Sequence, residues 1–205
     1  MSRNVLYAVR TSAVVLLAML TGFATPAAAS PLETVREAMS KAVLILNDLG
    51  SVEERRVELQ RTVGPYFDFS ETAKRALGRH KVKASAKELV EYEQLFVQLL
   101  EQRFLTRMLF TEGLGVRVAY LGERIDGDSV VVETKFFTAK GGEYIVGWHM
   151  HNVGGAWKSY DMTVEGVSLV RNYRSQFDRI LAGRTFREFL AKIRAKLAQS
   201  EARRQ

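Results

Sequence analysis

Helical patterns and helix-breaking residues alternate over the first part of the chain. Apolar residues recur every three or four positions over residues 32–49, which predicts a first helix that ends at Gly50. A capping box of Ser51 and Glu54 predicts a second helix directly afterwards. Ser70 is the expected N-cap of a short third helix. Three consecutive helices therefore open the predicted fold.

A second capping box, Ser85 with Glu88, opens the longest predicted helix, at about residues 86–110. At 100° per residue its apolar side chains cover an arc of roughly 200°, about twice the width of an ordinary core-facing stripe. Such a helix either lies between two layers of protein or presents one flank to a cavity. Periodicity alone favours the first alternative, in which the helix is an ordinary part of the hydrophobic core.

Alternation of apolar and polar residues replaces the helical pattern after Gly113. Asp126-Gly127 and Gly154-Gly155 are turn signals within this part of the chain. Four antiparallel strands joined in sequence form a meander. The predicted strands are residues 116–120, 129–138, 143–150 and 156–164.

Helical spacing returns over residues 168–181 and 186–199. The order of helices, strands and helices predicts the α+β class, with helices packed on one face of a curved four-stranded antiparallel sheet. The chain contains no repeat, low-complexity segment or interdomain linker. A single domain is expected.

The N-terminus carries the pattern of an export signal. Arg3 and Arg10 precede a short apolar run, and Ala27-Ala28-Ala29 provide small residues for cleavage. The run is shorter than the roughly 20 residues that span a bilayer. We therefore expect residues 1–29 to be removed and residues 30–205 to form a domain in the periplasm; an uncleaved anchor is the alternative.

Composition narrows the class of partner. The 205-residue chain has a formal net charge of +7 and no cysteine, so neither a lipid anchor on cysteine nor a disulfide is expected. An exported basic protein meets anionic lipid surfaces rather than nucleic acid. The alternative is that scattered Lys and Arg residues only keep a small domain in solution.

Candidate catalytic and metal-binding chemistry is sparse. His149 and His151 lie two residues apart on a predicted strand and could begin a metal site, but no third ligand is evident, so solvated histidines are the favoured interpretation. The sequence lacks a Gly-x-Ser-x-Gly elbow and a Gly-rich phosphate loop. Tyr160 and Asp161 are the nearest guess for an acid/base pair, although adjacent strand residues point to opposite faces. We expect no metal, no cofactor and no catalytic residue.

Two segments carry more specific information than composition does. The first runs from Val63 through Gly64-Pro65-Tyr66-Phe67-Asp68-Phe69 to Arg79, and the second runs from Trp157 through Gly166-Val167-Ser168-Leu169-Val170 and Asn172-Tyr173-Arg174-Ser175-Gln176 to Phe177. Together with the aromatic and leucine-rich residues 96–100, they resemble the MlaC-type periplasmic phospholipid-binding proteins, also called the toluene-tolerance family. The resemblance covers about residues 32–199.

This resemblance implies a helix-plus-sheet fold that encloses an apolar cavity for acyl chains. It also implies a monomeric periplasmic carrier, not an enzyme, that moves phospholipid between an inner-membrane ABC transporter complex with an MCE-domain protein and an outer-membrane lipoprotein–porin complex. A hopanoid-like lipid is an alternative cargo. An exported enzyme with a small hydrophobic substrate and an adaptor without a cavity are alternative functions. The sequence departs from the family pattern at His80-Lys81-Val82, Phe104 and Trp148-His149.

The resemblance shifts the interpretation of the long helix toward a cavity. Ordinary core packing is the alternative for every apolar candidate. Arg171 and Arg174 are candidates for the head-group phosphate, with helix capping or ion pairing as the alternative. The expected lipid-binding residues are Tyr66, Phe67, Phe96, Leu100, Phe104, Val132, Phe136, Tyr144, Val146, Trp148, Leu169, Tyr173 and Phe177.

Overall fold

The computed structural model of the protein describes residues 29–48, 50–110, 116–138 and 141–202, and side chains within these ranges except those of residues 104–110 and 200–202. The expected signal peptide lies outside the described residues, apart from Ala29. Within the described part of the chain, no helix is both long and apolar enough to cross a membrane.

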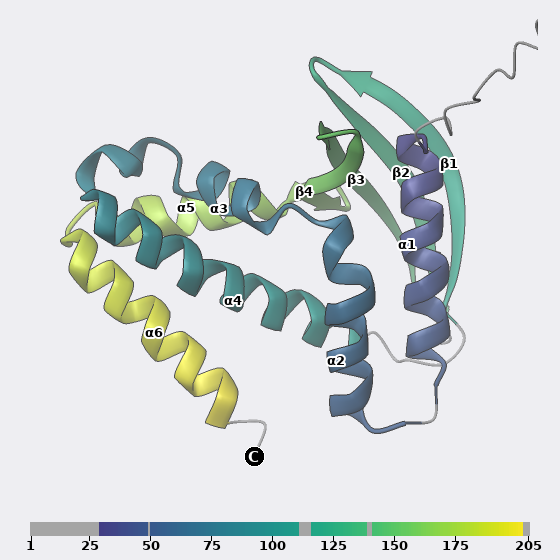
Figure 1. The fold of residues 1–205 in the computed structure, drawn as a ribbon, viewed down its shortest axis with the longest axis horizontal. Helices are drawn as coiled ribbons and strands as arrows, with labels where there is room; N and C mark the ends of the chain where they lie inside the picture. The colour runs from purple at the N-terminus through teal and green to yellow at the C-terminus, as the bar shows by residue number, and fades with distance from the viewer. Residues whose placement is uncertain (1–28, 49, 111–115, 139–140, 203–205) are drawn as a thin grey trace, which may run out of the picture.

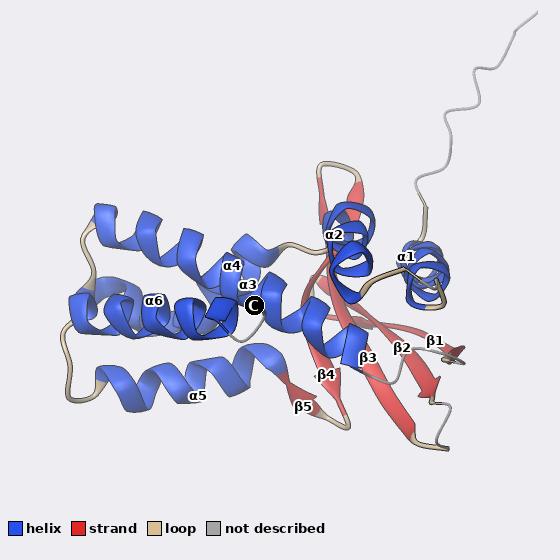
Figure 2. Ribbon diagram, turned by 90° about the horizontal axis from the view of Figure 1, so that it is seen from below, coloured by secondary structure: helices blue, strands red, loops and turns tan. Residues whose placement is uncertain are grey.

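One half of the molecule is a curved antiparallel sheet covered by two helices (Figures 1 and 2). The strands follow one another in the sheet in chain order, as a meander. The two helices are α1 (Pro31–Leu46) and α2 (Val52–Val63). The strands are β1 (Arg117–Asp126), β2 (Ser129–Phe137), β3 (Glu143–Val153), β4 (Ala156–Val164) and β5 (Val167–Ser168).

The other half is a bundle of four helices that lies beside the sheet (Figure 2). Short 3-10 helices η1 (Gly64–Tyr66) and η2 (Gly78–Lys83) lead into and out of its first helix. The bundle consists of α3 (Phe69–Leu77), α4 (Ala86–Phe110), α5 (Leu169–Leu181) and α6 (Phe186–Ala202).

Each half has its own hydrophobic core. In the sheet half, Val35, Met39 and Leu59 of the two helices pack with buried strand residues such as Val132 and Trp148; we call this set the sheet core. In the bundle half, aromatic rings dominate, as in the contact of Phe96 with Phe177 at 5.1 Å between ring centroids; we call this set the bundle core. The two cores meet along a seam.

The α+β class and the curved antiparallel sheet are confirmed, and so are both predicted capping boxes. The sheet has a fifth strand that the alternation did not predict. Glu165 and Gly166 adopt positive φ angles of 48° and 75°, so the chain reverses tightly and Val167–Ser168 pairs with β4. Ser168 then caps α5 by accepting a hydrogen bond from the backbone N–H of Arg171.

Several predicted boundaries were wrong. The first helix, α1, ends at Leu46 rather than at residue 49, and β1 continues to Asp126 rather than ending at residue 120. Asp68, not Ser70, is the N-cap of α3, because it directly precedes the first helical residue and its carboxylate accepts the N–H of Glu71 at 2.9 Å. The first hairpin turn consists of Gly127 and Asp128, since Asp126 still pairs with Ser129 in the sheet.

The wide apolar arc of α4 is explained by its surroundings, because the helix contacts α2, α3 and α6. Tyr92, Phe96, Leu99 and Leu100 are buried. The Tyr92 hydroxyl donates a hydrogen bond to the Ala73 carbonyl at 2.8 Å, and burial raises the pKa of Tyr92 far above its usual value, which keeps the donor protonated. Most of the arc is therefore core, and Leu100, a buried residue of the same arc, also lines a small cavity.

Two consecutive hydrogen bonds through the buried Thr134 hydroxyl lie within the sheet core, and they lead to a prediction about stability. Trp148 Nε1 donates to Thr134 Oγ1 at 2.8 Å, and Thr134 Oγ1 donates to the Val146 carbonyl at 3.1 Å. Thr134→Val leaves the indole N–H without an acceptor, so the free energy of unfolding should fall by about 1–3 kcal/mol in urea titrations. Thr163→Val, at a half-buried hydroxyl with only a 3.5 Å contact, is the control and should change stability by less than about 0.5 kcal/mol. Equal losses in both variants would contradict this account.

Candidate functional site

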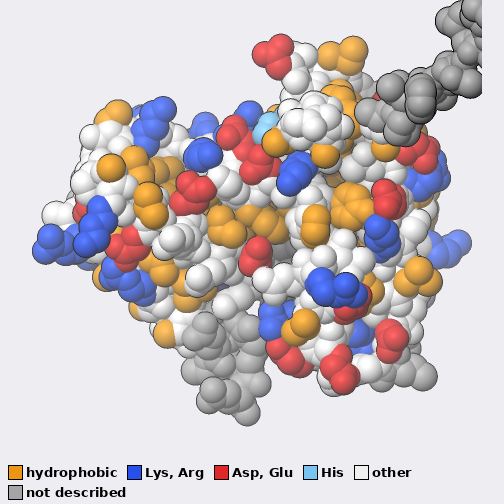
Figure 3. All heavy atoms as spheres, viewed as in Figure 1, with side chains coloured by type: hydrophobic (Ala, Val, Ile, Leu, Met, Phe, Trp, Pro, Cys, Tyr) orange, Lys and Arg blue, Asp and Glu red, His pale blue; other side chains and the backbone are white. Residues whose placement is uncertain are grey.

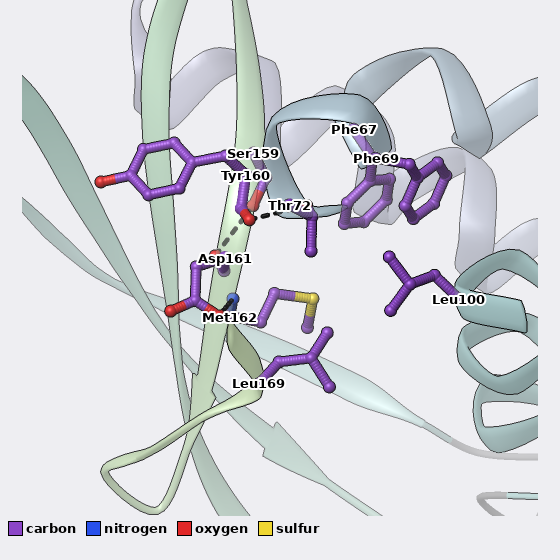
Figure 4. A pocket seen from close by; sticks show the side chains of 9 residues that line it. All are labelled: Phe67, Phe69, Thr72, Leu100, Ser159, Tyr160, Asp161, Met162 and Leu169. Atoms are coloured by element: carbon purple, nitrogen blue, oxygen red, sulfur yellow. Dashed lines mark hydrogen bonds between the residues drawn. The ribbon is translucent and has the colours of Figure 1, made fainter. Parts of the chain in front are cut away.

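A small cavity lies on the seam between the two cores (Figure 4). It has a volume of about 20 Å³, which is room for roughly one water molecule. Its walls come from the connection between η1 and α3, from α3 and α4, from β4 and from the first residue of α5. The lining residues are Phe67, Phe69, Thr72, Leu100, Ser159, Tyr160, Asp161, Met162 and Leu169.

The alternation of Phe67, Asp68 and Phe69 builds one wall of the cavity. The backbone N–H of Asp68 donates to the Ser159 carbonyl at 2.8 Å, so this segment lies along the edge of β4. The rings of Phe67 and Phe69 stack with their centroids 5.3 Å apart, and Phe67 also contacts Trp148 at 6.0 Å. Phe67 therefore joins the bundle core to the sheet core.

The polar side chains of the cavity wall are bound by the protein itself. Thr72 Oγ1 donates to the Tyr160 carbonyl at 2.7 Å, and Ser159 Oγ donates to the Asp161 carbonyl at 3.1 Å. The Tyr160 ring points away from the cavity in Figure 4 and lies under the Arg75 guanidinium at 3.8 Å. The groups left to meet a ligand are the apolar side chains of Phe67, Phe69, Leu100, Met162 and Leu169. The cavity is suited to hydrocarbon rather than to a polar substrate.

Hydrogen bonds to the Asp161 carboxylate connect the bundle to the sheet. One carboxylate oxygen accepts the backbone N–H groups of Met162 at 2.8 Å and Val170 at 2.9 Å, and the other accepts the Ser168 hydroxyl at 2.5 Å. Because Val170 lies in the first turn of α5, the carboxylate also stabilises that helix terminus. These bonds give Asp161 a structural role, and Tyr160 is turned to the opposite side, so the two do not form an acid/base pair.

Neither strand histidine is part of a metal cluster among the residues that the structure describes. His151 Nε2 lies 3.0 Å from Asp68 Oδ2 and so ties β3 to the N-terminus of α3. Burial lowers the pKa of His149, which favours the neutral ring.

A hydrogen bond also links α2 of the sheet half to α4 of the bundle half. Gln60 donates to Glu101 at 3.0 Å, and burial raises the pKa of Glu101.

The predicted lipid-binding residues fall into four places. Tyr144 is 43% exposed, and the side chain of Phe104 lies outside the described part of the structure. Only three line the cavity, and these are Phe67, Leu100 and Leu169. Phe96, Tyr173 and Phe177 belong to the bundle core, and Tyr66, Val132, Phe136, Val146 and Trp148 belong to the sheet core.

Sequence reasoning missed four side chains of the cavity wall, namely Phe69, Thr72, Ser159 and Met162. Phe69 was detectable, because it alternates with Phe67 in an extended segment. Met162 pairs with Trp148 across the sheet, so it lies on the same face as Trp148, which is one of the predicted lipid-binding residues.

The two arginine candidates differ in what they contact. Arg174 donates from Nε and an Nη atom to the Arg75 carbonyl, at 3.1 and 2.5 Å, and so binds the end of α3. Arg171 is exposed and makes one side-chain hydrogen bond, to the Gly166 carbonyl at 3.2 Å. Arg171, two residues from the cavity residue Leu169, therefore has more donors available for a ligand.

Comparison with solved structures defines the class of fold. The chain is similar to the phospholipid-binding protein from Ralstonia solanacearum, solved in complex with a phospholipid, with a TM-score of 0.73 and 21% sequence identity. The match covers 84% of this chain and 99% of that one. The two proteins share one α+β fold.

Comparison of sequences adds the family. The chain is 26% identical over 120 residues to Toluene tolerance protein ttg2D of Pseudomonas putida, and the match covers 58% of this chain and 55% of that relative. It therefore aligns with about half the length of this relative. The family model described as MlaC protein matches residues 36–195. The chain belongs to the MlaC family, which confirms the resemblance found in residues 63–79 and 157–177.

The bonds of Asp161 predict that Asp161→Ala is destabilising. The change leaves two backbone N–H groups and one hydroxyl without their charged acceptor, so the free energy of unfolding should fall by about 2–4 kcal/mol. Thermal and urea unfolding measure the loss. Asp128→Ala, in the exposed first hairpin turn, is the matched control and should stay within about 0.5 kcal/mol of wild type. An unchanged stability of Asp161→Ala would contradict the structural role.

Proposed function

We propose that this protein is a periplasmic carrier that binds a phospholipid by its acyl chains and moves it between membranes. The observation that carries the proposal is the apolar seam between two hydrophobic cores, where the polar wall groups are already bound and apolar side chains remain. Membership of the MlaC family and a shared fold with a protein solved in complex with a phospholipid support it. In this proposal, residues 1–29 are the export signal and residues 30–205 are the carrier domain.

Lipid entry requires the two halves to separate along the seam. A volume of about 20 Å³ holds no acyl chain. Phe67, Leu100 and Leu169 are the first apolar side chains that a chain would meet. As the seam widens, neighbouring side chains of the two cores, including Trp148 and Phe96, extend the lining. Arg171, which is exposed, is the proposed partner of the phosphate.

The energetics explain why such a carrier exchanges lipid at membranes rather than releasing it into water. Each buried methylene contributes about 0.8 kcal/mol relative to water, so two sixteen-carbon tails would gain roughly 25 kcal/mol. That exceeds the ceiling of about 18–21 kcal/mol for non-covalent affinity. In the cell the tails leave one bilayer and enter another, so the cavity needs only to match hydrocarbon to within a few kcal/mol. An inner-membrane ABC transporter complex with an MCE-domain protein and an outer-membrane lipoprotein–porin complex are the proposed partners between which the lipid moves.

Lipid retention tests the proposal. The purified protein should carry phospholipid, seen as a bound mass in native mass spectrometry and as phosphorus in an organic extract. Leu169→Gln places an amide in the cavity wall and should lower the retained lipid about ten-fold or more. Leu44→Gln, at a side chain that is 73% exposed, should retain lipid as wild type does.

Two results would contradict the proposal: a wild-type protein without extractable lipid, or equal retention by both glutamine variants. An extract that contains a hopanoid instead of a phospholipid would keep the carrier function and correct its cargo.

A further inference from the structure

Basic residues gather at the end of the bundle that is farthest from the sheet (Figures 1 and 3). Two segments of eleven residues, 78–88 and 178–188, meet at this end, because η2 contacts α5 and both α4 and α5 contact α6. They contain seven basic and three acidic residues, a net charge of +4, whereas the whole chain has +7. The basic residues, which we call the basic end, are Arg79, Lys81, Lys83, Lys87, Arg179, Arg184 and Arg187, and all are exposed.

The acidic residues at this end already accept hydrogen bonds from other groups of the protein. Glu88 accepts hydrogen bonds from the backbone N–H and hydroxyl of Ser85, at 2.9 and 2.8 Å. Glu188 accepts the equivalent bonds from Thr185, at 2.8 and 3.0 Å. Both carboxylates are thus turned toward the backbone of their own helix.

The segment His80-Lys81-Val82-Lys83 is anchored so that its exposed residues face outward. His80 is 5% exposed, and its Nε2 lies 2.6 Å from Asp178 Oδ1 on α5. Val82 is 82% exposed and lies between two lysines. A buried histidine therefore fixes the base of a tip that presents one apolar side chain flanked by two ammonium groups.

We propose that the basic end is a docking surface for anionic phospholipid bilayers. Each Lys or Arg near an anionic membrane strengthens binding, and Val82 can enter the interfacial region while the flanking lysines remain at the head groups. A protein interface of ordinary size needs a broad apolar centre, and the tip offers only Val82. A bilayer needs no such centre.

This surface lies away from the lipid cavity. From Leu169 at the cavity to Leu181 at the basic end, α5 extends about 18 Å at 1.5 Å per residue. Docking by the basic end would hold the protein at a membrane while leaving the seam uncovered. The proposal goes beyond lipid carriage, since a protein can retain lipid in its cavity without binding vesicles.

Vesicle sedimentation of the mature protein tests the proposal. At low ionic strength the protein should sediment with phosphatidylcholine vesicles that contain one-third phosphatidylglycerol, and not with pure phosphatidylcholine. About 0.5 M salt should release it. Lys81→Glu with Lys83→Glu should weaken partitioning by more than about 25-fold, since each lysine lost costs about five-fold and the two new carboxylates add repulsion. Val82→Ser should weaken it about five-fold.

The matched control is Arg103→Glu with Arg117→Glu, which makes the same change in net charge at exposed positions on the C-terminal half of α4 and on β1. This variant should lose much less binding than the lysine pair. Equal losses in the two double variants would overturn the proposal, because net charge alone would then explain binding. Equal binding to both vesicle types, or a lysine variant that binds as wild type, would overturn it as well.

Retained lipid is measured in the same samples. A lysine variant that loses vesicle binding but keeps its lipid supports the docking surface independently of the carrier function. A wild-type protein that binds anionic vesicles but contains no lipid contradicts the carrier function and leaves the docking surface standing.

Discussion

The carboxylate of Asp161 and the edge of β4 hold together two hydrophobic cores that would otherwise be independent layers. Asp161 binds the start of α5, while Ser159 and Tyr160 accept hydrogen bonds from the segment that begins α3. These contacts are polar and lie at the rim of the seam. The interior of the seam is apolar, and the two halves also meet where α2 contacts α4, but they are not merged into a single core.

This arrangement explains how one domain can be stable and still admit hydrocarbon. Each half buries its own aromatic or aliphatic side chains, so opening the seam would expose the core side chains at the boundary while most of each core stays packed. A single close-packed core would resist insertion of an acyl chain, because protein interiors have few voids larger than a water molecule. The separation into two cores is the structural basis of the proposed function.

Local chemistry could be predicted well from the sequence. The capping boxes at Ser51 and Ser85 and the turn at Gly154-Gly155 depend on residues close to each other in the chain, and the structure has all three. Boundaries set by tertiary contacts could not be predicted so well. Asp68 is the cap of α3 because its segment lies along β4, a contact that no local pattern reports.

The cavity was the least predictable feature, for a physical reason. Periodicity shows that one face of an element is apolar, but it does not say which of two cores that face joins. Phe96 and Leu100 lie one turn apart on α4, yet Phe96 packs among aromatic rings and Leu100 lines the seam. Only the placement of β4 and α5 against α4 separates these two roles.

The most direct test of the central claim is where an acyl chain lies in the loaded protein. A phospholipid with a diazirine at the end of one acyl chain can be loaded, activated by light and mapped on the protein by mass spectrometry. Adducts on the seam side chains Phe67, Leu100, Met162 or Leu169 are the predicted result. Adducts confined to exposed apolar residues such as Leu44 and Ile125 would contradict a lipid-binding seam.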